Sequence, residues 1–146
     1  MLNMQTNTKI SKILVVDDEE TSLLLISTLL SLYDFTVVQA NNGPAALKIL
    51  KDHAFDLILL DIMMPEMDGF EVCKRLKAAA PTQNIPVIFV SAYIDEESRA
   101  KGTLLGAEGF VNKPFMADEL ISAIVAQSAP AQPLMPVFKN QYNLVN

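Results

Sequence analysis

Short runs of apolar residues recur along the chain and give its first structural signal. Five of them stand out: Lys12–Val16, Thr36–Gln39, Leu57–Leu60, Val87–Val90 and Gly109–Asn112. Four of the five are close to unbroken in apolar character, which is typical of strands that are buried on both faces. We therefore predict five β-strands in a sheet that is covered from both sides.

The segments between these runs favour helices. The last of them places Leu120, Ile121, Ile124 and Val125 on one face. Pro81 ends the third, because proline lacks an N–H group and disfavours helix in the residue before it. Strand and helix alternate five times, which predicts an α/β fold with a parallel sheet and right-handed crossovers. The predicted helices are, approximately, Glu20–Tyr33, Pro44–His53, Asp68–Ala80, Asp95–Leu105 and Ala117–Gln127.

Proline marks the end of the predicted domain. Residues 128–136 contain Pro130, Pro133 and Pro136, a composition that is typical of extended linkers. We assign residues 1–10 to an N-terminal leader, 11–127 to the domain, and 128–146 to a proline-rich linker or tail. This last segment is either a native tail or the beginning of a linker to an effector domain.

Composition narrows the function further. The chain has 146 residues, 51% of them hydrophobic, which suits one folded domain. Its net charge of −6, without a basic stripe, argues against direct binding of nucleic acid. The single cysteine, Cys73, excludes an internal disulfide and fits a reducing compartment. The polar N-terminus predicts no signal peptide, and no apolar stretch is long enough for a membrane span. We expect a cytoplasmic protein.

Charged residues follow three of the predicted strands directly. Asp17 and Asp18 follow the first, Asp61 the third, and Lys113 the fifth. Since ligands of open α/β sheets bind outside the carboxyl ends of the strands, these side chains are expected to share one site. Carboxylates that lie so close together repel each other by about 4 kcal/mol per pair, at a separation of 4 Å and an effective dielectric constant of 20. A hard divalent metal together with the lysine would balance them, and the pattern predicts a site for a phosphoryl group.

Four motifs around these residues resemble the receiver domain of two-component response regulators, of the kind found in chemotaxis receivers. They read ILVVDDEE, LILLDIMMPEMDGFE, IPVIFVSAY and GAEGFVNKPF, and the resemblance runs from about Lys12 to Gln127. It implies the flavodoxin-like doubly wound fold, with five parallel strands in the order 2-1-3-4-5 and five helices. It also implies a phosphorylation-dependent switch.

The resemblance assigns the acidic residues to phosphoryl chemistry. Asp61 is the implied phosphoacceptor, which takes the group from a phosphohistidine of a sensor histidine kinase or a histidine phosphotransfer protein. Asp18 is the implied direct ligand of Mg²⁺, Asp17 its neighbour in the site, and Met63 a ligand through its backbone carbonyl. The alternatives are that Asp61 caps the following helix, and that Asp17 and Asp18 stabilise a helix N-terminus through its dipole.

Four further positions carry roles in the family. Lys113 is implied to neutralise the phosphoryl oxygens, and its bond to Pro114 is expected to be cis, although only about 5% of X-Pro bonds are. Ser91 would donate a hydrogen bond to the phosphoryl group. Phe110 takes the place of an aromatic switch residue that is commonly tyrosine, so it would act without a hydroxyl, or it is an ordinary core phenylalanine.

Met63 and Tyr93 lie two residues beyond Asp61 and Ser91, where family side chains flank the path of the hydrolytic water. Both are bulky and uncharged, which predicts slow self-dephosphorylation. The only histidine, His53, is expected on the surface and is not a phosphodonor.

Other functions fit less well. A phosphate-independent interaction module would usually lack one of the five residues Asp17, Asp18, Asp61, Ser91 and Lys113. A haloacid-dehalogenase-type phosphohydrolase needs a second aspartate where Met63 stands, so we do not expect an enzyme. The output remains open: an effector domain or separate effector protein, a larger regulator or hybrid kinase, and a homodimer are all compatible with the sequence.

Overall fold

The five strands form one parallel sheet in the order β2-β1-β3-β4-β5. A computed structural model describes residues 9–128. Helices α1 to α4 connect successive strands and α5 follows the last one, so the alternation predicted from the sequence is confirmed. In chain order the elements are β1 (Lys12–Val16), α1 (Glu20–Leu32), β2 (Thr36–Ala40), α2 (Gly43–Asp52), β3 (Leu57–Leu60), α3 (Gly69–Ala78), β4 (Val87–Ser91), α4 (Glu96–Leu104), β5 (Gly109–Asn112) and α5 (Ala117–Ala126).

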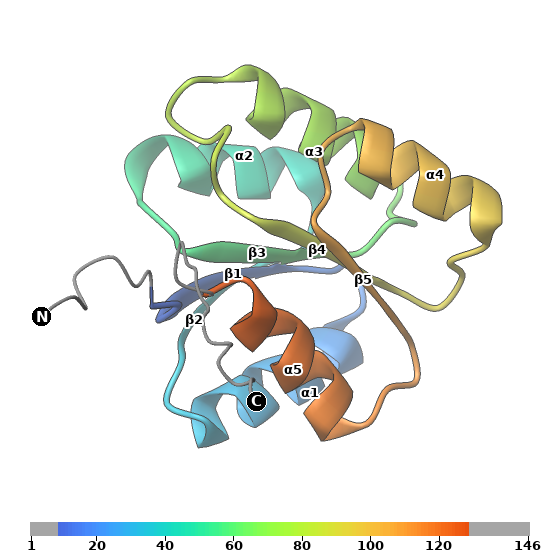
Figure 1. Cartoon of the computed structure of the whole chain (residues 1–146). Coiled ribbons are helices and arrows are strands. Elements are labelled where there is room, and N and C mark those ends of the chain that lie inside the picture. Colours follow the sequence, from blue (N-terminus) through green and yellow to red (C-terminus); the bar gives the residue numbers. More distant parts are fainter. Residues whose placement is uncertain (1–8, 129–146) are drawn as a thin grey trace, which may run out of the picture.

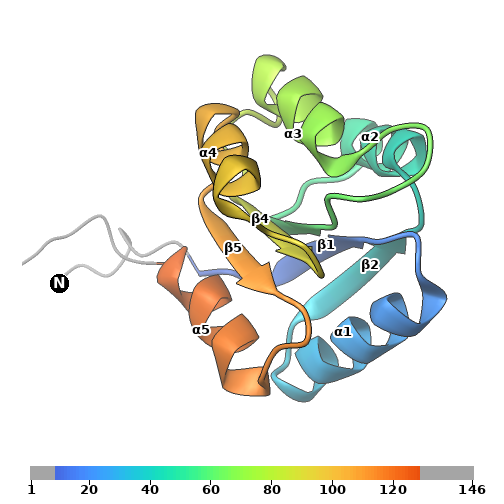
Figure 2. The same cartoon turned by 90° about the vertical axis from the view of Figure 1, so that its right-hand side faces the viewer.

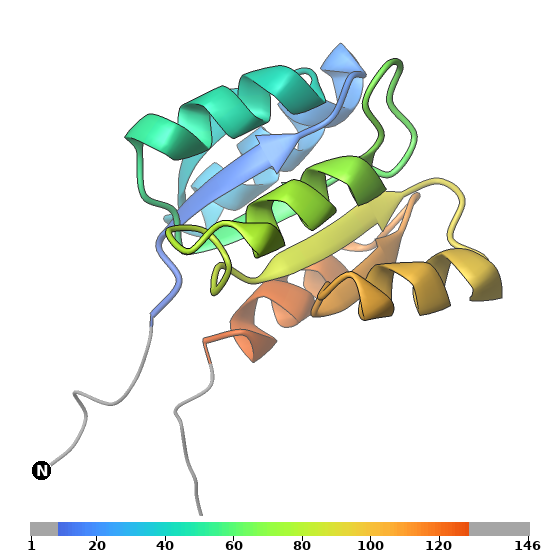
Figure 3. The same ribbon diagram turned by 90° about the horizontal axis from the view of Figure 1, so that it is seen from above.

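Helices cover both faces of the sheet. α2, α3 and α4 lie on one face and α1 and α5 on the other, as the views in Figures 1 and 2 show. Figure 3 looks onto the first face, with α4 at the side of the β5 edge. Each face has its own hydrophobic core: one packs α2 and α3 against the sheet, and the other packs α1 and α5. The flavodoxin-like architecture is therefore confirmed.

Burial follows the position of each strand in the sheet. All residues of β3 and β4 are buried, and β1 is buried from its second residue onward. The edge strands β2 and β5 are only partly buried. Central strands pack against helices on both faces, whereas an edge strand has one side open. The unbroken apolar runs therefore marked the three interior strands correctly, but at least one of the four runs expected to be buried on both faces lies at a partly buried edge.

Three details differ from the sequence predictions. Val125, predicted on the packed face of the last helix, is 53% exposed, because Leu120 and Ile124 alone face the sheet fully. α3 ends at Ala78, before the predicted end at Ala80, since Ala79 is already extended and the buried Thr82 hydroxyl donates to the Leu76 carbonyl. The other boundaries move by at most a residue or so at either end.

No helix among residues 9–128 is long and apolar enough to cross a membrane. The proline-rich linker predicted from Ser128 onward lies almost wholly outside the described residues, as does most of the predicted leader.

Candidate phosphoryl and metal site

The register of the sheet brings the acidic residues together. β1 and β3 are neighbours, and Val16 pairs with Leu60, so the residues that follow them lie side by side. The Asp61 N–H donates to the Val16 carbonyl at 2.9 Å, and the Asp17 N–H donates to the Ala40 carbonyl at 3.1 Å. These backbone bonds fix both aspartates at the carboxyl edge of the sheet, where the sequence predicts a site.

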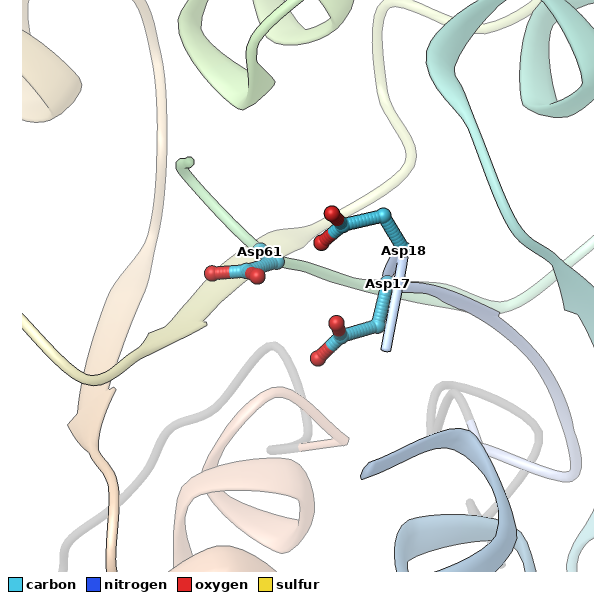
Figure 4. Close-up of side chains that lie close together, drawn as sticks. All are labelled: Asp17, Asp18 and Asp61. Atoms are coloured by element: carbon cyan, nitrogen blue, oxygen red, sulfur yellow. The ribbon is translucent and has the colours of Figure 1, made fainter. Parts of the chain in front are cut away.

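The three carboxylates form a cluster. One oxygen from each of Asp17, Asp18 and Asp61 lies within 4.8 Å of the others. Asp17 and Asp61 are buried, at 1% and 7% exposure, whereas Asp18 is open to solvent. In Figure 4, Asp17 and Asp18 extend from the same turn toward the Asp61 side chain. Oxygen donors at this spacing, with one side open, suit a hard divalent cation that keeps some of its water.

Lys113 supplies positive charge to the same place. Its Nζ lies 2.6 Å from Asp17 Oδ2, 3.8 Å from Asp61 Oδ2 and 3.9 Å from Glu19 Oε1. The Lys113 backbone N–H donates to the Ser91 carbonyl at 2.8 Å, which holds the lysine at the end of β5. The Lys113–Pro114 bond is cis, in agreement with the expectation from the resemblance. One ammonium group therefore lies within ion-pair distance of three acidic side chains.

Backbone N–H groups orient two of the carboxylates. Ile62 N–H donates to Asp61 Oδ1 at 2.8 Å, and Glu19 N–H donates to Asp17 Oδ1 at 2.9 Å. Each carboxylate thus has one oxygen fixed by the backbone. The other oxygen of each, Oδ2, faces Lys113. Asp17 Oδ2, at 2.6 Å, is closer to the Lys113 ammonium than Asp61 Oδ2, at 3.8 Å.

Burial makes Asp61 harder to ionise than an ordinary aspartate. It raises the pKa of Asp61 from 3.8 to about 6, and the nearby negative charge of Asp17 adds to this effect. Lys113, the Ser91 side chain and the Ile62 N–H act in the opposite direction but do not compensate. Burial and the Asp17 charge thus outweigh the effect of Lys113 on Asp61, and additional positive charge would favour the ionised form of this carboxylate.

The remaining predicted residues lie on β4 and β5 and in the loops after β3 and β4. Ser91 is the last residue of β4 and is buried. Phe110, in β5, is half-buried and stacks on Phe89 with ring centroids 5.8 Å apart. Met63 and Tyr93 lie in the loops after β3 and β4, and their side chains are 65% and 66% exposed. These two side chains are therefore open to solvent at the same edge of the sheet.

The sequence analysis did not predict two residues that contribute to the site, Ser22 and Gly69. The Ser22 hydroxyl accepts a hydrogen bond from Lys113 Nζ at 3.1 Å, and its place in the first turn of α1, just after the acidic pair, was an available signal. Gly69 begins α3 so close to β3 that a Cβ on it would overlap the Asp61 carbonyl oxygen. Its N–H donates to the Ile62 carbonyl at 2.7 Å. Gly69 thus helps to fix the backbone beside Asp61.

A doubly wound α/β domain with a carboxylate cluster and a lysine at the carboxyl edge of its sheet defines the class of this protein. The model of the response regulator receiver domain matches residues 13–125. The chain belongs to this family, which is a family of signalling domains. Phosphorylation and Mg²⁺ are general features of its members.

Known proteins agree with this assignment. A probable transcriptional regulator, ycf27 of Cyanidium caldarium, is 40% identical over 112 residues, which are 77% of this chain and 44% of the relative. The chemotaxis protein CheY4 of Vibrio cholerae superposes with a TM-score of 0.77 at 28% identity, covering 81% of this chain and 98% of that one. The signal receiver domain of a histidine kinase from Syntrophus aciditrophicus gives a TM-score of 0.76 at 27% identity, covering 89% and 98%.

The length of the match differs between these two kinds of relative. The chain spans 44% of the ycf27 regulator, 23% of the response regulator PleD and 51% of the regulatory protein PhoP. It spans nearly all of the solved receiver domains. The resemblance therefore concerns the receiver part of the longer regulators.

Proposed function

We propose that this domain receives a phosphoryl group on Asp61 from a phosphohistidine. The observation that carries this proposal is the geometry of Asp61, a nearly buried carboxylate with one oxygen fixed by a backbone N–H and the other 3.8 Å from Lys113. Asp61 Oδ2 would attack the phosphorus atom while the P–N bond breaks and its electrons return to the imidazole. The product is an aspartyl phosphate.

Mg²⁺ is the metal that best suits the site. Asp18 would be a direct ligand, with Asp17, Asp61 and the backbone carbonyl of Met63 completing the protein's share of the coordination sphere. The bound ion would neutralise negative charge on the phosphoryl oxygens. Lys113, already between Asp17 and Asp61, would do the same from the other side and hold the transferred group in place.

The signal would leave the site through Ser91 and Phe110. Ser91 is buried at the end of β4, next to Asp61, and its hydroxyl would donate to the phosphoryl group. Its movement toward Asp61 would free space for the Phe110 ring in the neighbouring strand. The surface around β4, α4, β5 and α5 would then change. Because phenylalanine has no hydroxyl, this coupling depends on packing.

The lifetime of the phosphorylated state would depend on Met63 and Tyr93. Both side chains are exposed at the edge where water must approach Asp61, and neither carries a charge that orients water. We expect slow self-dephosphorylation. The double variant Met63→Asn, Tyr93→Glu should shorten the phosphoryl half-life, measured by the decay of the intact-mass adduct. An unchanged half-life would contradict this assignment.

The partners follow from the relatives, which are response regulators. A sensor histidine kinase or a histidine phosphotransfer protein would supply the phosphoryl group in the cytoplasm, and an effector domain or protein would respond to it. The domain would belong to a larger regulator, since it spans 44% of the ycf27 regulator, or to a hybrid kinase, since the similar Syntrophus structure is the receiver domain of a histidine kinase. Homodimerisation is an additional route by which the changed surface could act.

Small phosphodonors test the proposal without a known kinase. The protein is incubated with acetyl phosphate or phosphoramidate, with and without Mg²⁺, and its intact mass is measured. We expect a Mg²⁺-dependent gain of one phosphoryl group that is absent in Asp61→Asn. If no adduct forms in the folded protein, the phosphate-independent interaction module becomes the better interpretation.

A further inference from the structure

Helix α4 has an unusual attachment to the rest of the domain. Gly102 is its only buried residue, and Leu104 is 88% exposed. α1, α2, α3 and α5 each bury at least two residues, most of them apolar side chains, against the sheet or a neighbouring helix. α4 therefore lacks the apolar stripe that fixes an ordinary surface helix. Other contacts must hold it in place.

Two cationic side chains of α4 lie on an aromatic column. The rings of Phe70, Phe89 and Phe110 follow one another, with centroid distances of 5.4 Å and 5.8 Å. The Arg99 guanidinium lies 5.0 Å from the centroid of Phe110, at one end of the column. Lys101 Nζ lies 4.6 Å from the centroid of Phe70, at the other end. Both distances are within the range of cation–π attraction.

Gly102 allows the Phe110 ring to lie against the helix. A Cβ at this position would come within 2.8 Å of two carbon atoms of the Phe110 ring and 3.1 Å of Phe89. Real Cβ atoms essentially never come closer than 3.0 Å to another heavy atom, so the Phe110 ring occupies space that the side chain of any other residue would fill. Gly102 and Arg99 thus provide the place in which the ring rests.

The Phe110 ring also has a route toward the phosphoryl site. Phe110 pairs with Phe89 in the sheet, and Ser91 is two residues beyond Phe89 in the same strand. Since side chains alternate along a strand, these three residues share one face of the sheet. A ring that leaves Arg99 and Gly102 can therefore turn along β5 toward Ser91. The two positions exclude each other because one ring cannot occupy both.

We infer that Arg99 is a positioning residue that holds Phe110 against α4 and so keeps the domain in its resting conformation. The inference rests on the proposed function, in which Ser91 moves toward a phosphorylated Asp61. Movement of the ring would break the Arg99 contact and remove one of the contacts that attach α4 to the domain. Phosphorylation would thereby be coupled to the release of α4 through a cation–π contact, in a chain that lacks a tyrosine hydroxyl at this position.

Two charge-removing variants on the same helix provide a matched test. Arg99→Gln removes the cation at Phe110, and Lys101→Gln removes the cation at Phe70. Both residues are exposed, so both variants are expected to fold. The affinity for beryllofluoride with Mg²⁺, a stable mimic of the phosphoryl group, is measured by calorimetry. NMR couplings of the free proteins give the χ1 rotamer populations of Phe110.

Arg99→Gln should bind beryllofluoride about two- to five-fold more tightly than the wild type, because an exposed cation–π contact is lost from the resting state only. The minor Phe110 rotamer should increase by the same factor. Lys101→Gln should change neither quantity. Gly102→Ala, which displaces the ring sterically, should also increase the minor rotamer.

Equal affinities and equal rotamer populations in Arg99→Gln and Lys101→Gln would overturn the inference. If the wild type binds no beryllofluoride and gains no phosphoryl group, the proposed function fails instead. The rotamer populations of the free proteins then still decide whether Arg99 holds the ring.

Discussion

The two edges of the sheet use acidic side chains in opposite ways. At the amino edge, Asp56 precedes β3 and its Oδ2 accepts the N–H groups of Ser11 and Lys12, at 3.0 and 2.8 Å, where β1 begins. Glu108 precedes β5 in the same manner, and its Oε1 accepts the N–H of Val87, the first residue of β4, at 2.8 Å. Each carboxylate thus caps the free N–H at the beginning of the neighbouring strand.

Lys77 completes the amino edge. Its Nζ donates to the Glu108 carboxylate at 3.1 Å and to the Ile85 carbonyl at 2.8 Å. The negative charge of Glu108 and the Ile85 carbonyl therefore both have a partner. Buried or half-buried polar groups with partners of this kind stabilise a fold, or at least cost little. The amino edge has the properties of a structural connection.

At the carboxyl edge the same residue types are poorly balanced. Asp17, Asp18 and Asp61 cluster around one ammonium group, and the pKa of Asp61 is raised to about 6. This excess of negative charge costs stability unless a cation is added. This contrast supports the proposal that the functional site lies at the carboxyl edge, where negative charge is left without a full partner, whereas the paired charges of the amino edge stabilise the fold.

The largest effect is expected when the lysine of the carboxyl edge is removed. Lys113→Met would leave the buried Asp17 carboxylate without its 2.6 Å partner, which should lower the free energy of unfolding by about 3 kcal/mol at neutral pH. Chemical denaturation with and without Mg²⁺ measures the loss. Mg²⁺ should restore more stability to this variant than to the wild type. A loss of less than ~1 kcal/mol, which is typical of exposed ion pairs, would contradict the comparison.

Removal of a negative charge from the carboxyl edge should stabilise the protein. Asp61→Asn is expected to raise the free energy of unfolding at pH 7 by up to about 3 kcal/mol, the equivalent of a pKa raised from 3.8 to about 6. Denaturation at a series of pH values measures it. A destabilised Asp61→Asn variant at pH 7 would show that the carboxylate is not strained in the free protein.

The pH dependence follows from the direction of the shift. The folded protein binds more protons than the unfolded chain between about pH 4 and pH 6, because the folded-state pKa of Asp61 is the higher one. Stability contributed by this group therefore falls as the pH rises through that window, and the cost is complete above it. The advantage of Asp61→Asn should vanish below about pH 4.

The smallest of these effects is expected at the amino edge. Glu108→Ala leaves the Val87 N–H without its acceptor and removes the carboxylate partner of Lys77, which should lower the free energy of unfolding by about 2 kcal/mol. Glu108→Gln, which keeps an acceptor, should cost less. Neither variant should alter the response to Mg²⁺, as measured by the shift in melting temperature. A changed response would mean that the two edges are not independent.

The sequence predicted the sheet well because the signal is local. Apolar runs such as Leu57–Leu60 marked the buried strands, and the charged residue directly after each run was carried to one edge by the parallel topology. Contacts between distant segments gave no such signal. The hydrogen bond from Lys113 to Ser22, the approach of Gly69 to Asp61 and the aromatic column beside Arg99 depend on packing in three dimensions. Val125 was placed wrongly because helical periodicity does not tell how wide the packed face is.

We propose that the carboxyl edge is a charge-strained site that needs a divalent cation and that Asp61 is its decisive group. The melting temperatures of the wild type and Asp61→Asn, each measured at pH 7 with and without Mg²⁺, test it most directly. We predict that Mg²⁺ raises the melting temperature of the wild type and has a much smaller effect on Asp61→Asn, which is already the more stable protein without metal. An equal response of both proteins, or no response of the wild type, would contradict the claim.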